Sequence, residues 1–434
     1  MISAVALTAG AAPSDGTCVA PTDNLGTLVG DLQPLSGPGA LRDPRRAVAF
    51  VDAYDDGLGL SKDARHGKDA LMKADAQSFF AANPDLFYED LSGAYRNERS
   101  LTARTAPSIT IAGDPHLGNF GTYRGPDGHA VYGINDFDQA RTGSPEQDLE
   151  RLATSAAIEA RRAHLSRDQQ DAIVTAIADR YFKTIRKLRH GESPAFLGAK
   201  DADGKVRKAI DDADGVKRAD FLDPLTKTSH GDERFRKTGE LLDLDPRVRE
   251  PIERGLREYG ATLPRDAHVR VPLEILDVAG KLGSGGSTFG LPRYYALVKN
   301  ADPSKRPIVL EIKQGLPSSD PAHVVERERT LGGLSNPLTG ATHAGGADLL
   351  VRELEPEKSR IDLAHLDGRK EIQSVAAQDA EALARAHAAK AGNADAIDRW
   401  IGGDADAATA KLREFADAYA NQAEADRAAF ARSL

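Results

Sequence analysis

An aspartate and an asparagine stand five residues apart in one short polar segment, Gly113-Asp114-Pro115-His116-Leu117-Gly118-Asn119. The segment follows the β-branched run at residues 108–112, which predicts a strand that ends in a tight loop. An aspartate there could orient an attacking hydroxyl and accept its proton, and an asparagine five residues later could hold a Mg²⁺ ion that bridges nucleotide phosphates. Asp114 and Asn119 are therefore candidates for phosphoryl-transfer chemistry.

A second acidic segment, Asn135-Asp136-Phe137-Asp138, follows the next predicted strand at residues 130–134. A carboxylate at the end of that strand suits a metal contact, which makes Asp136 a candidate ligand beside Asn119. The Gly-Asp-Pro-His text alone is equally typical of a β-turn in which Asp114 caps backbone amides and His116 is solvated. Two acidic clusters on consecutive strand ends favour a functional site over that turn.

Three segments together resemble a bacterial family catalogued as domain of unknown function 2252, and the resemblance spans most of the chain: Gly113-Asp114-Pro115-His116-Leu117-Gly118-Asn119-Phe120, Asn135-Asp136-Phe137-Asp138 and Asp148-Leu149-Glu150-Arg151-Leu152. The same segments are similar to the aminoglycoside phosphotransferase branch of the protein-kinase-like fold. The catalytic loop of that branch reads His-Gly-Asp-x-x-x-x-Asn and its metal strand reads Ile-Asp-Phe/Trp. Ala112 stands here where that loop has its histidine.

This resemblance implies a role for each acidic residue. Asp114 would be the catalytic aspartate, and Asn119 and Asp136 would bind the metal. Asp138 would assist at the metal, and Asp148 would be the helix carboxylate that holds the catalytic loop. Apart from the resemblance, Asp148 is equally well explained as a first-turn helix residue that the helix dipole favours.

A glycine-rich segment in the second half also resembles part of a kinase, the small nucleotide-binding lobe. It contains Gly283, Ser284, Gly285, Gly286 and Ser287, and a strand-like run ending at Lys313 follows. A glycine hairpin lets backbone amides approach phosphates, and a lysine on a following strand can neutralise them. Neither feature is specific alone, because a hairpin turn often contains glycine and a lysine on a strand is often a solvated edge residue. The interpretation therefore depends on the order in which the glycine turn, the strand with its lysine and the acidic helix follow one another.

The predicted helix after Lys313 offers Glu326 or Glu328 as the acidic partner that orients the lysine. We expect the Lys313 ammonium, partly solvated, to face the cleft that holds Asp114 and Asp136. His387 lies on an alanine-rich predicted helix, where a histidine is more often packed or hydrogen-bonded than a ligand.

The expected fold class is α+β, with a protein-kinase-like, two-lobed arrangement. Because the small-lobe text follows the catalytic loop, we expect a circular permutation. The sequence predicts a flexible tail or signal remnant at residues 1–41 and a helical large lobe with the catalytic and metal loops at 42–268. A small β-rich nucleotide lobe is expected at 269–362, and C-terminal helices that pack on the large lobe at 363–434. Within the large lobe, the charge-dense residues 189–245 predict an exposed, loop-rich segment.

The amino-acid composition limits the classes of binding partner and the cellular compartment that we expect for this protein. The 57 basic and 66 acidic residues give a formal charge of −9, and no long basic run predicts nucleic-acid binding. Cys18 is the only cysteine, which fits a reducing compartment and a cytoplasmic protein. No apolar run approaches the roughly 18 residues of a membrane span. The apolar N-terminus keeps export as the alternative, if it is a truncated signal peptide.

These residues favour an ATP- and Mg²⁺-dependent phosphotransferase that acts on a small molecule or a protein hydroxyl. A nucleotide-binding pseudokinase or regulatory module would use the same pocket without turnover. A metal-dependent phosphohydrolase would use Asp114, His116, Asp136 and Asp138, and a nucleotidyl transferase on the same fold stays open as well. No motif indicates the phosphoacceptor.

Overall fold

The computed structural model describes residues 42–95, 100–190, 196–229, 231–283, 285–316, 319–332 and 336–434. These residues form a mixed α+β protein, as the sequence predicts. They divide into two compact units, which we call the helical unit and the sheet unit. The helical unit contains residues 42–215, 326–332 and 357–434, and the sheet unit contains residues 216–325 and 336–356.

The predicted domain boundaries coincide only partly with these units. The nucleotide lobe predicted at residues 269–362 overlaps the sheet unit, which also includes residues 216–268. The tail predicted at residues 1–41 lies outside the described residues. The lobe boundaries, the kinase-like arrangement and the permutation stay predictions.

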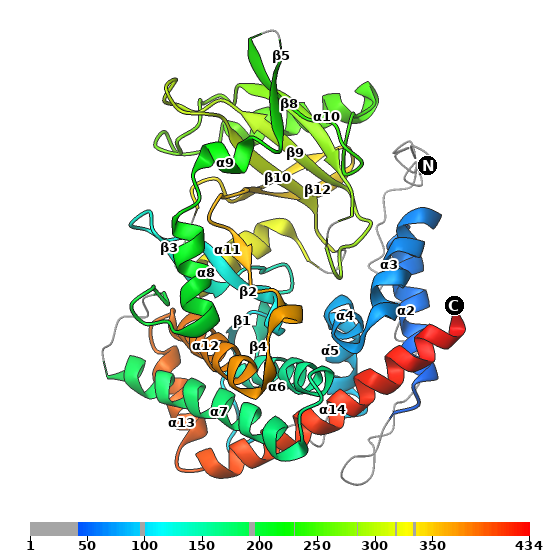
Figure 1. Cartoon of the computed structure of the whole chain (residues 1–434), viewed down its shortest axis with the longest axis vertical. Helices are drawn as coiled ribbons and strands as arrows, with labels where there is room; N and C mark the ends of the chain where they lie inside the picture. The colour runs from blue at the N-terminus through cyan, green and yellow to red at the C-terminus, as the bar shows by residue number, and fades with distance from the viewer. Residues whose placement is uncertain are drawn as a thin grey trace. The chain divides into compact units, whose positions relative to one another are not determined.

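Helices make up most of the helical unit (Figure 1): α2 (Arg45–Gly57), α3 (Lys62–Ala74), α4 (Ala76–Ala82), α5 (Pro84–Ser92), α6 (Pro145–Arg162), α7 (Arg167–Arg189), α8 (Gly204–Asp214), α12 (Gly368–Ala388), α13 (Asn393–Ile401) and α14 (Ala405–Ser433). Helix α6 packs against α7, α12 and α14. A capping box starts it, because Ser144 accepts a hydrogen bond from the backbone of Glu146 while the Gln147 side chain accepts one from the Ser144 amide. Most of α6 is buried, including Asp148 and Arg151, so these polar side chains need partners inside the protein.

Two small antiparallel sheets carry the loops of interest in the helical unit. Strand β1 (Ile109–Ile111) pairs with β4 (Arg141–Gly143), and β2 (Phe120–Arg124) lies between β13 (Ser359–Arg360) and β3 (Ala130–Ile134). Two short 3-10 helices, η1 (Leu117–Asn119) and η2 (Leu363–His365), complete this unit. The two strands predicted around the polar loop are β1 and β3. They lie in different sheets: β1 pairs with β4, and β3 pairs with β2, the strand that begins directly after the loop.

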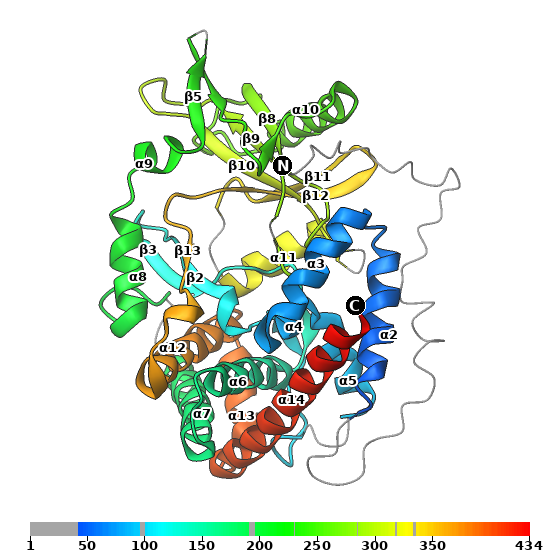
Figure 2. The same cartoon turned by 45° about the vertical axis from the view of Figure 1, so that its right-hand side comes forward.

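The sheet unit is built on a six-stranded antiparallel sheet with the order β11-β12-β10-β9-β8-β7 (Figure 2). The strands and helices of the unit are β5 (Thr226–Ser229), β6 (Asp232–Phe235), β7 (Leu241–Leu242), β8 (Ile275–Lys281), β9 (Arg293–Val298), β10 (Ile308–Gln314), β11 (Gly340–Ala344), β12 (Ala347–Glu353), α9 (Arg218–Leu222) and α10 (Pro246–Gly260). Helix α11 (Pro321–Gly332) begins in this unit and ends in the helical unit.

Alternating side chains give this sheet two hydrophobic clusters. Ala296 and Leu310 belong to a cluster that also contains residues of α10, whereas Leu297 and Val309 belong to a cluster with Leu222 of α9. A strand sends successive side chains to opposite faces, so both faces of the central strands are covered. This explains why the runs in β9 and β10 are almost continuously apolar.

The segment from 189 to 245 was predicted to be exposed and loop-rich, and the structure differs from part of this prediction. It contains α8, α9 and three short strands. Val206, Ile210 and Ala213 are buried on one face of α8, at the spacing of an amphipathic helix. Most described residues of the segment are exposed, as predicted. The loop-rich part of the prediction was wrong, because the dense charges lie on the solvent side of elements that a few apolar residues anchor.

None of the helices in the described part of the chain combines the length and apolar character that crossing a bilayer requires.

A buried charged network ties the first described residues to the last helix. The Arg42 guanidinium bonds Asp90 at 2.6 Å and Asp426 at 2.7 Å, and all three side chains are at most 3% exposed. One guanidinium thus serves two buried carboxylates. Burial raises the pKa of Asp426 from 3.8 to about 6, although Arg42 opposes the shift.

We expect Asp426→Asn to change the pH dependence of stability. The folded pKa of Asp426 is raised, so its contribution to stability is fully present below pH 3.8 and is lost as the pH rises through about 6. The free energy of unfolding of the wild type relative to the variant should therefore fall, by an amount on the order of 1 kcal/mol, between about pH 5 and pH 7.5. Urea unfolding of both proteins at these two pH values measures it, and a difference that is independent of pH would contradict the assignment.

Candidate active site

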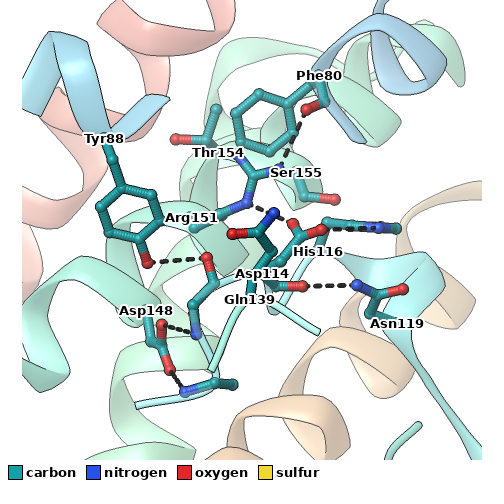
Figure 3. Close-up of polar contacts among 12 residues, drawn as sticks. Phe80, Tyr88, Asp114, His116, Asn119, Gln139, Asp148, Arg151, Thr154 and Ser155 are labelled. Carbon is teal, nitrogen blue, oxygen red and sulfur yellow. Dashed lines mark hydrogen bonds and ion pairs between the residues drawn. The ribbon is translucent and has the colours of Figure 1, made fainter. Parts of the chain in front are cut away.

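The loop after β1 is held by a carboxylate of α6 (Figure 3). Asp148 Oδ2 accepts a hydrogen bond from the Ala112 amide at 2.7 Å, and its Oδ1 accepts one from the Gly113 amide at 3.0 Å. Gly113 has a φ of +80°, and a Cβ there would lie 2.0 Å from the Gln139 carbonyl oxygen. Glycine is therefore required at this turn, and Asp148 fixes the backbone immediately before Asp114.

A buried histidine and a buried tyrosine support Asp148 from behind. His387 Nε2 lies 3.0 Å from Asp148 Oδ2, and the Tyr181 hydroxyl lies 2.7 Å from His387 Nδ1. Burial and the charge of Asp148 raise the pKa of Tyr181 well above 10, so its hydroxyl keeps its proton. Because a carboxylate oxygen only accepts hydrogen bonds, the ring nitrogen that faces Asp148, His387 Nε2, is the donor of this contact. These contacts link α7, α12 and α6 to the loop, so His387 is hydrogen-bonded, as its helix position predicts.

Asp114 is paired with a buried arginine of α6. Arg151 Nε donates to Asp114 Oδ1 at 2.5 Å, and its Nη2 donates to the Phe80 carbonyl at 3.1 Å. The guanidinium carbon also lies 4.2 Å from the centroid of the Phe80 ring. Figure 3 shows this guanidinium between the Phe80 ring and Asp114. The side chain of Arg151 is 0% exposed, so it holds one Asp114 oxygen in a fixed direction.

Two donors close to Asp114 are buried without a hydrogen-bond partner among the described residues, Arg151 Nη1 and Gln139 Nε2. Figure 3 shows the Gln139 amide beside Arg151 and Asp114. A buried donor that lacks an acceptor costs about 1–3 kcal/mol, so an oxygen atom beside these two donors, from a water or from a ligand, would be stabilising.

Burial dominates the electrostatics of this loop. It raises the pKa of Asp114 from 3.8 to about 7, with Arg151 opposing and Asp136 adding to the shift. Burial, Arg151 and Arg360 together lower the pKa of His116 well below 6.5. His116 is therefore neutral near pH 7, and its Nε2 lies 3.9 Å from Asp114 Oδ2. Its Nδ1 accepts from the Gly118 amide, so that nitrogen is not available to a metal.

Asn119 belongs to the same loop as Asp114 and contacts it. Asn119 Nδ2 donates to the Asp114 carbonyl at 2.8 Å, and η1 carries the asparagine. Ser155 of α6 also holds this helical turn, because its Oγ accepts from the Leu117 amide at 3.0 Å. With Nδ2 engaged, the Asn119 oxygen is the atom that could ligate a cation.

The segment after β3 brings a second carboxylate to this region. The Asn135 amide donates to the Asn119 carbonyl at 2.8 Å, so the residue before Asp136 is bonded to the loop that carries Asp114. Asp136 is partly buried, and its charge contributes to the raised pKa of Asp114. Asp138 is 8% exposed, and its amide donates to Asp136 Oδ1 at 3.4 Å.

These residues fit Mg²⁺ better than a metal held by the protein alone. No group of three His, Cys, Asp or Glu side chains arranged for a metal occurs among the residues that the structure describes. Asn119 and Asp136 carry hard oxygen donors, and Mg²⁺ in nucleotide sites uses one or two protein carboxylates, with phosphate oxygens and waters completing its shell. Asp136 would supply one such carboxylate and Asn119 an amide oxygen.

The predicted phosphate-binding residues lie in the sheet unit. Gly283, Gly285, Gly286 and Ser287 belong to the connection between β8 and β9, two strands that pair antiparallel. Gly283 and Gly285 have φ values of +68° and +103°, which glycine adopts without strain. Ser284 lies outside the described residues.

Lys313 and Glu326 fall in different units. Lys313 lies on β10, where it pairs with Arg293 of β9 and Leu350 of β12 in the register of the sheet. The expectation of a partly solvated lysine was wrong, because Lys313 is 2% exposed on a strand that has neighbours on both sides. Glu326 is exposed on α11 and belongs to the helical unit, as does Glu328. The predicted pairing with Lys313 stays a prediction.

Arg151 and Ser155 both contact the loop, although the sequence predicted no role for either residue. A helix that places Asp148 against the loop also places Arg151 and Ser155 there, because the three residues have the i, i+3, i+7 spacing of one helix face. This spacing was the signal in the sequence that could have identified them. Tyr88 was also missed, and its hydroxyl donates to the Gly113 carbonyl at 2.8 Å. No local pattern marks Tyr88, since α5 and the loop meet only in the folded chain.

One family model matches the chain over residues 62–433, and its description reads "Uncharacterized protein conserved in bacteria". The match includes every candidate residue named above. No curated protein and no solved structure matches the chain.

Proposed function

The chain belongs to the bacterial DUF2252 family, and from the geometry of its site we propose that it is an ATP- and Mg²⁺-dependent phosphotransferase. The acceptor in this proposal is a hydroxyl of a small molecule or of a protein. The protein-kinase-like fold, in its permuted form, belongs to the same proposal.

One observation carries the proposal. Asp114 and Asn119 are joined by a hydrogen bond on a single loop, and Asp148 holds the backbone of that loop by two amides. Phosphoryl transfer asks little covalent chemistry of a protein and depends on positioning and charge. A proton acceptor and a metal ligand on one anchored loop meet that requirement.

Each residue of the site has a different role in this proposal. Asp114 orients the acceptor hydroxyl and takes its proton through Oδ2, since Arg151 holds Oδ1. The buried donors Arg151 Nη1 and Gln139 Nε2 suit oxygen atoms of the acceptor or of the phosphoryl group. Asn119 and Asp136 would hold Mg²⁺, which when bound offsets charge on the phosphates. In the kinase-like arrangement Lys313 offsets the remaining phosphate charge.

The proposal predicts that MgATP stabilises the wild-type protein and that Asp136→Asn weakens this effect more than Asp114→Asn does. A ligand that binds only the native state stabilises it by about 2.7 kcal/mol at a concentration of 100 times Kd. A metal ligand acts when the nucleotide binds, whereas a proton acceptor acts mainly during turnover. Thermal unfolding of the full chain with ATP, with and without Mg²⁺, measures the difference.

A matched control is Asp212→Asn, which removes a carboxylate of the exposed ion pair with Lys208 on α8. This variant should respond to MgATP as the wild type does. If millimolar MgATP left the wild type unshifted, the proposed function would be refuted. Equal responses of Asp136→Asn and the wild type would refute only the role of Asp136.

A further inference from the structure

A short strand from the C-terminal part of the chain lies against the candidate site. In β13, Ser359 and Arg360 pair with Thr122 and Gly121 of β2. A Cβ at Gly121 would lie 2.0 Å from the Ser359 carbonyl oxygen, so the two strands can approach this closely only because residue 121 is glycine.

Side chains on both sides of this pairing fix the segment before Arg360. The Thr122 hydroxyl donates to the Glu357 carbonyl at 2.7 Å, and Arg124 bonds the Glu357 carboxylate at 2.8 Å. Asn135 Nδ2 donates to the Ser359 carbonyl at 3.1 Å. Lys358 Nζ donates to the Asn135 carbonyl at 3.2 Å. The backbone that carries Arg360 is therefore bound to β2 and to the residue that precedes Asp136.

This attachment places the positively charged side chain of Arg360 beside Asp136, the candidate metal ligand. Arg360 Nη2 lies 3.7 Å from Asp136 Oδ2, and the Arg360 side chain is 49% exposed. The positive charge of Arg360 also contributes to the lowered pKa of His116, which places it near the loop that carries Asp114. Arg360 is therefore a half-exposed positive charge beside Asp136.

We propose that Arg360 is a phosphate-binding residue that recognises the terminal phosphate of ATP. This inference rests on the proposed function. A phosphate that binds through a cation at Asp136 would come close to that carboxylate, and the Arg360 guanidinium already lies beside it. A guanidinium presents paired N–H donors that match phosphate oxygens, and the exposed Arg360 stem has the freedom to turn from the carboxylate to the phosphate.

Two opposite changes follow for Arg360→Ala. The affinity for MgATP should fall by about tenfold or more, because a charge-assisted hydrogen bond to phosphate is lost, while the affinity for MgADP, which lacks the terminal phosphate, should not fall. The affinity for Mn²⁺ alone should rise by about two- to fivefold, because an exposed cation no longer competes for Asp136. A residue that only supported the fold would not raise one affinity and lower another.

The experiment is titration calorimetry of the full chain with MgATP, MgADP and MnCl₂. Arg360→Lys keeps the charge without the paired donors and should retain Mn²⁺ binding close to that of the wild type, with an intermediate MgATP affinity. The matched control is Arg104→Ala, an arginine of the same unit that is 50% exposed and paired with Asp404. This control should leave all three affinities unchanged.

The outcomes separate the two proposals. If the wild type binds both nucleotides and Arg360→Ala keeps the wild-type ratio of MgATP to MgADP affinity, the role of Arg360 is overturned and the proposed function stands. If the wild type binds neither nucleotide, the proposed function is overturned and the role of Arg360 with it. A selective loss of MgATP affinity together with tighter Mn²⁺ binding supports both.

Discussion

Asp114→Asn is expected to lower the turnover of MgATP by about 10²–10⁴-fold, the usual contribution of a positioned general base. Asparagine has nearly the same shape and can still accept the Arg151 hydrogen bond through its oxygen, but it cannot take the proton of an attacking hydroxyl. The affinity for MgATP should change far less than the turnover, since proton transfer occurs in the transition state. ADP formation, with water as the acceptor, measures turnover even though the natural acceptor is unidentified.

The pH dependence of the same assay adds a second test. The pKa of Asp114 is raised to about 7, so the wild-type rate should rise with pH through that region as the carboxylate loses its proton. The variant should lack this rise. Asp212→Asn again serves as the control and should match the wild type. If Asp114→Asn turned over ATP at the wild-type rate, Asp114 would not be the proton acceptor.

Local sequence patterns predicted the parts of the site that are close together in the chain. Asp114 and Asn119 share one loop because a strand, a turn and a short helical segment fit within a few residues, and their hydrogen bond is local. Asp136 was predicted for the same reason, since it lies two residues after a strand whose β-branched and aromatic residues are typical of β structure. Residue type and spacing are enough to predict that two residues lie together when a single turn of the chain places them.

The supporting contacts could not be predicted in this way, because they join distant segments. His387 and Asp148 are separated by 239 positions, and a lone histidine on an alanine-rich helix carries no sign of its partner. Arg360 reaches the site on the segment that pairs with β2, and a strand of two residues leaves no periodic pattern in the sequence. Lys313 was expected to be partly solvated because a strand lysine usually is, and its burial depends on the strands beside it.

The largest expected loss of stability is that of Asp148→Ala. The change removes the acceptor of the Ala112 and Gly113 amides and of His387 Nε2–H, all in a region where Asp148 is 0% exposed. Each buried donor left without a partner costs about 1–3 kcal/mol, so with three donors the free energy of unfolding should fall by at least about 3 kcal/mol. Urea unfolding measures the total, and hydrogen exchange of the Ala112 and Gly113 amides reports whether the loop itself has opened.

His387 and an ordinary helix aspartate provide graded comparisons for this prediction. His387→Leu removes one donor to Asp148 and should cost less than Asp148→Ala, whereas His387→Gln, which keeps an N–H donor, should recover part of the loss. Asp168→Ala removes an exposed first-turn aspartate of α7 and should change stability by no more than about 1 kcal/mol, the contribution of the helix dipole. If Asp148→Ala cost no more than Asp168→Ala, Asp148 would act only through the dipole of α6. A cost several times larger, with faster exchange at Ala112 and Gly113, would mean that α6 holds the loop that carries Asp114.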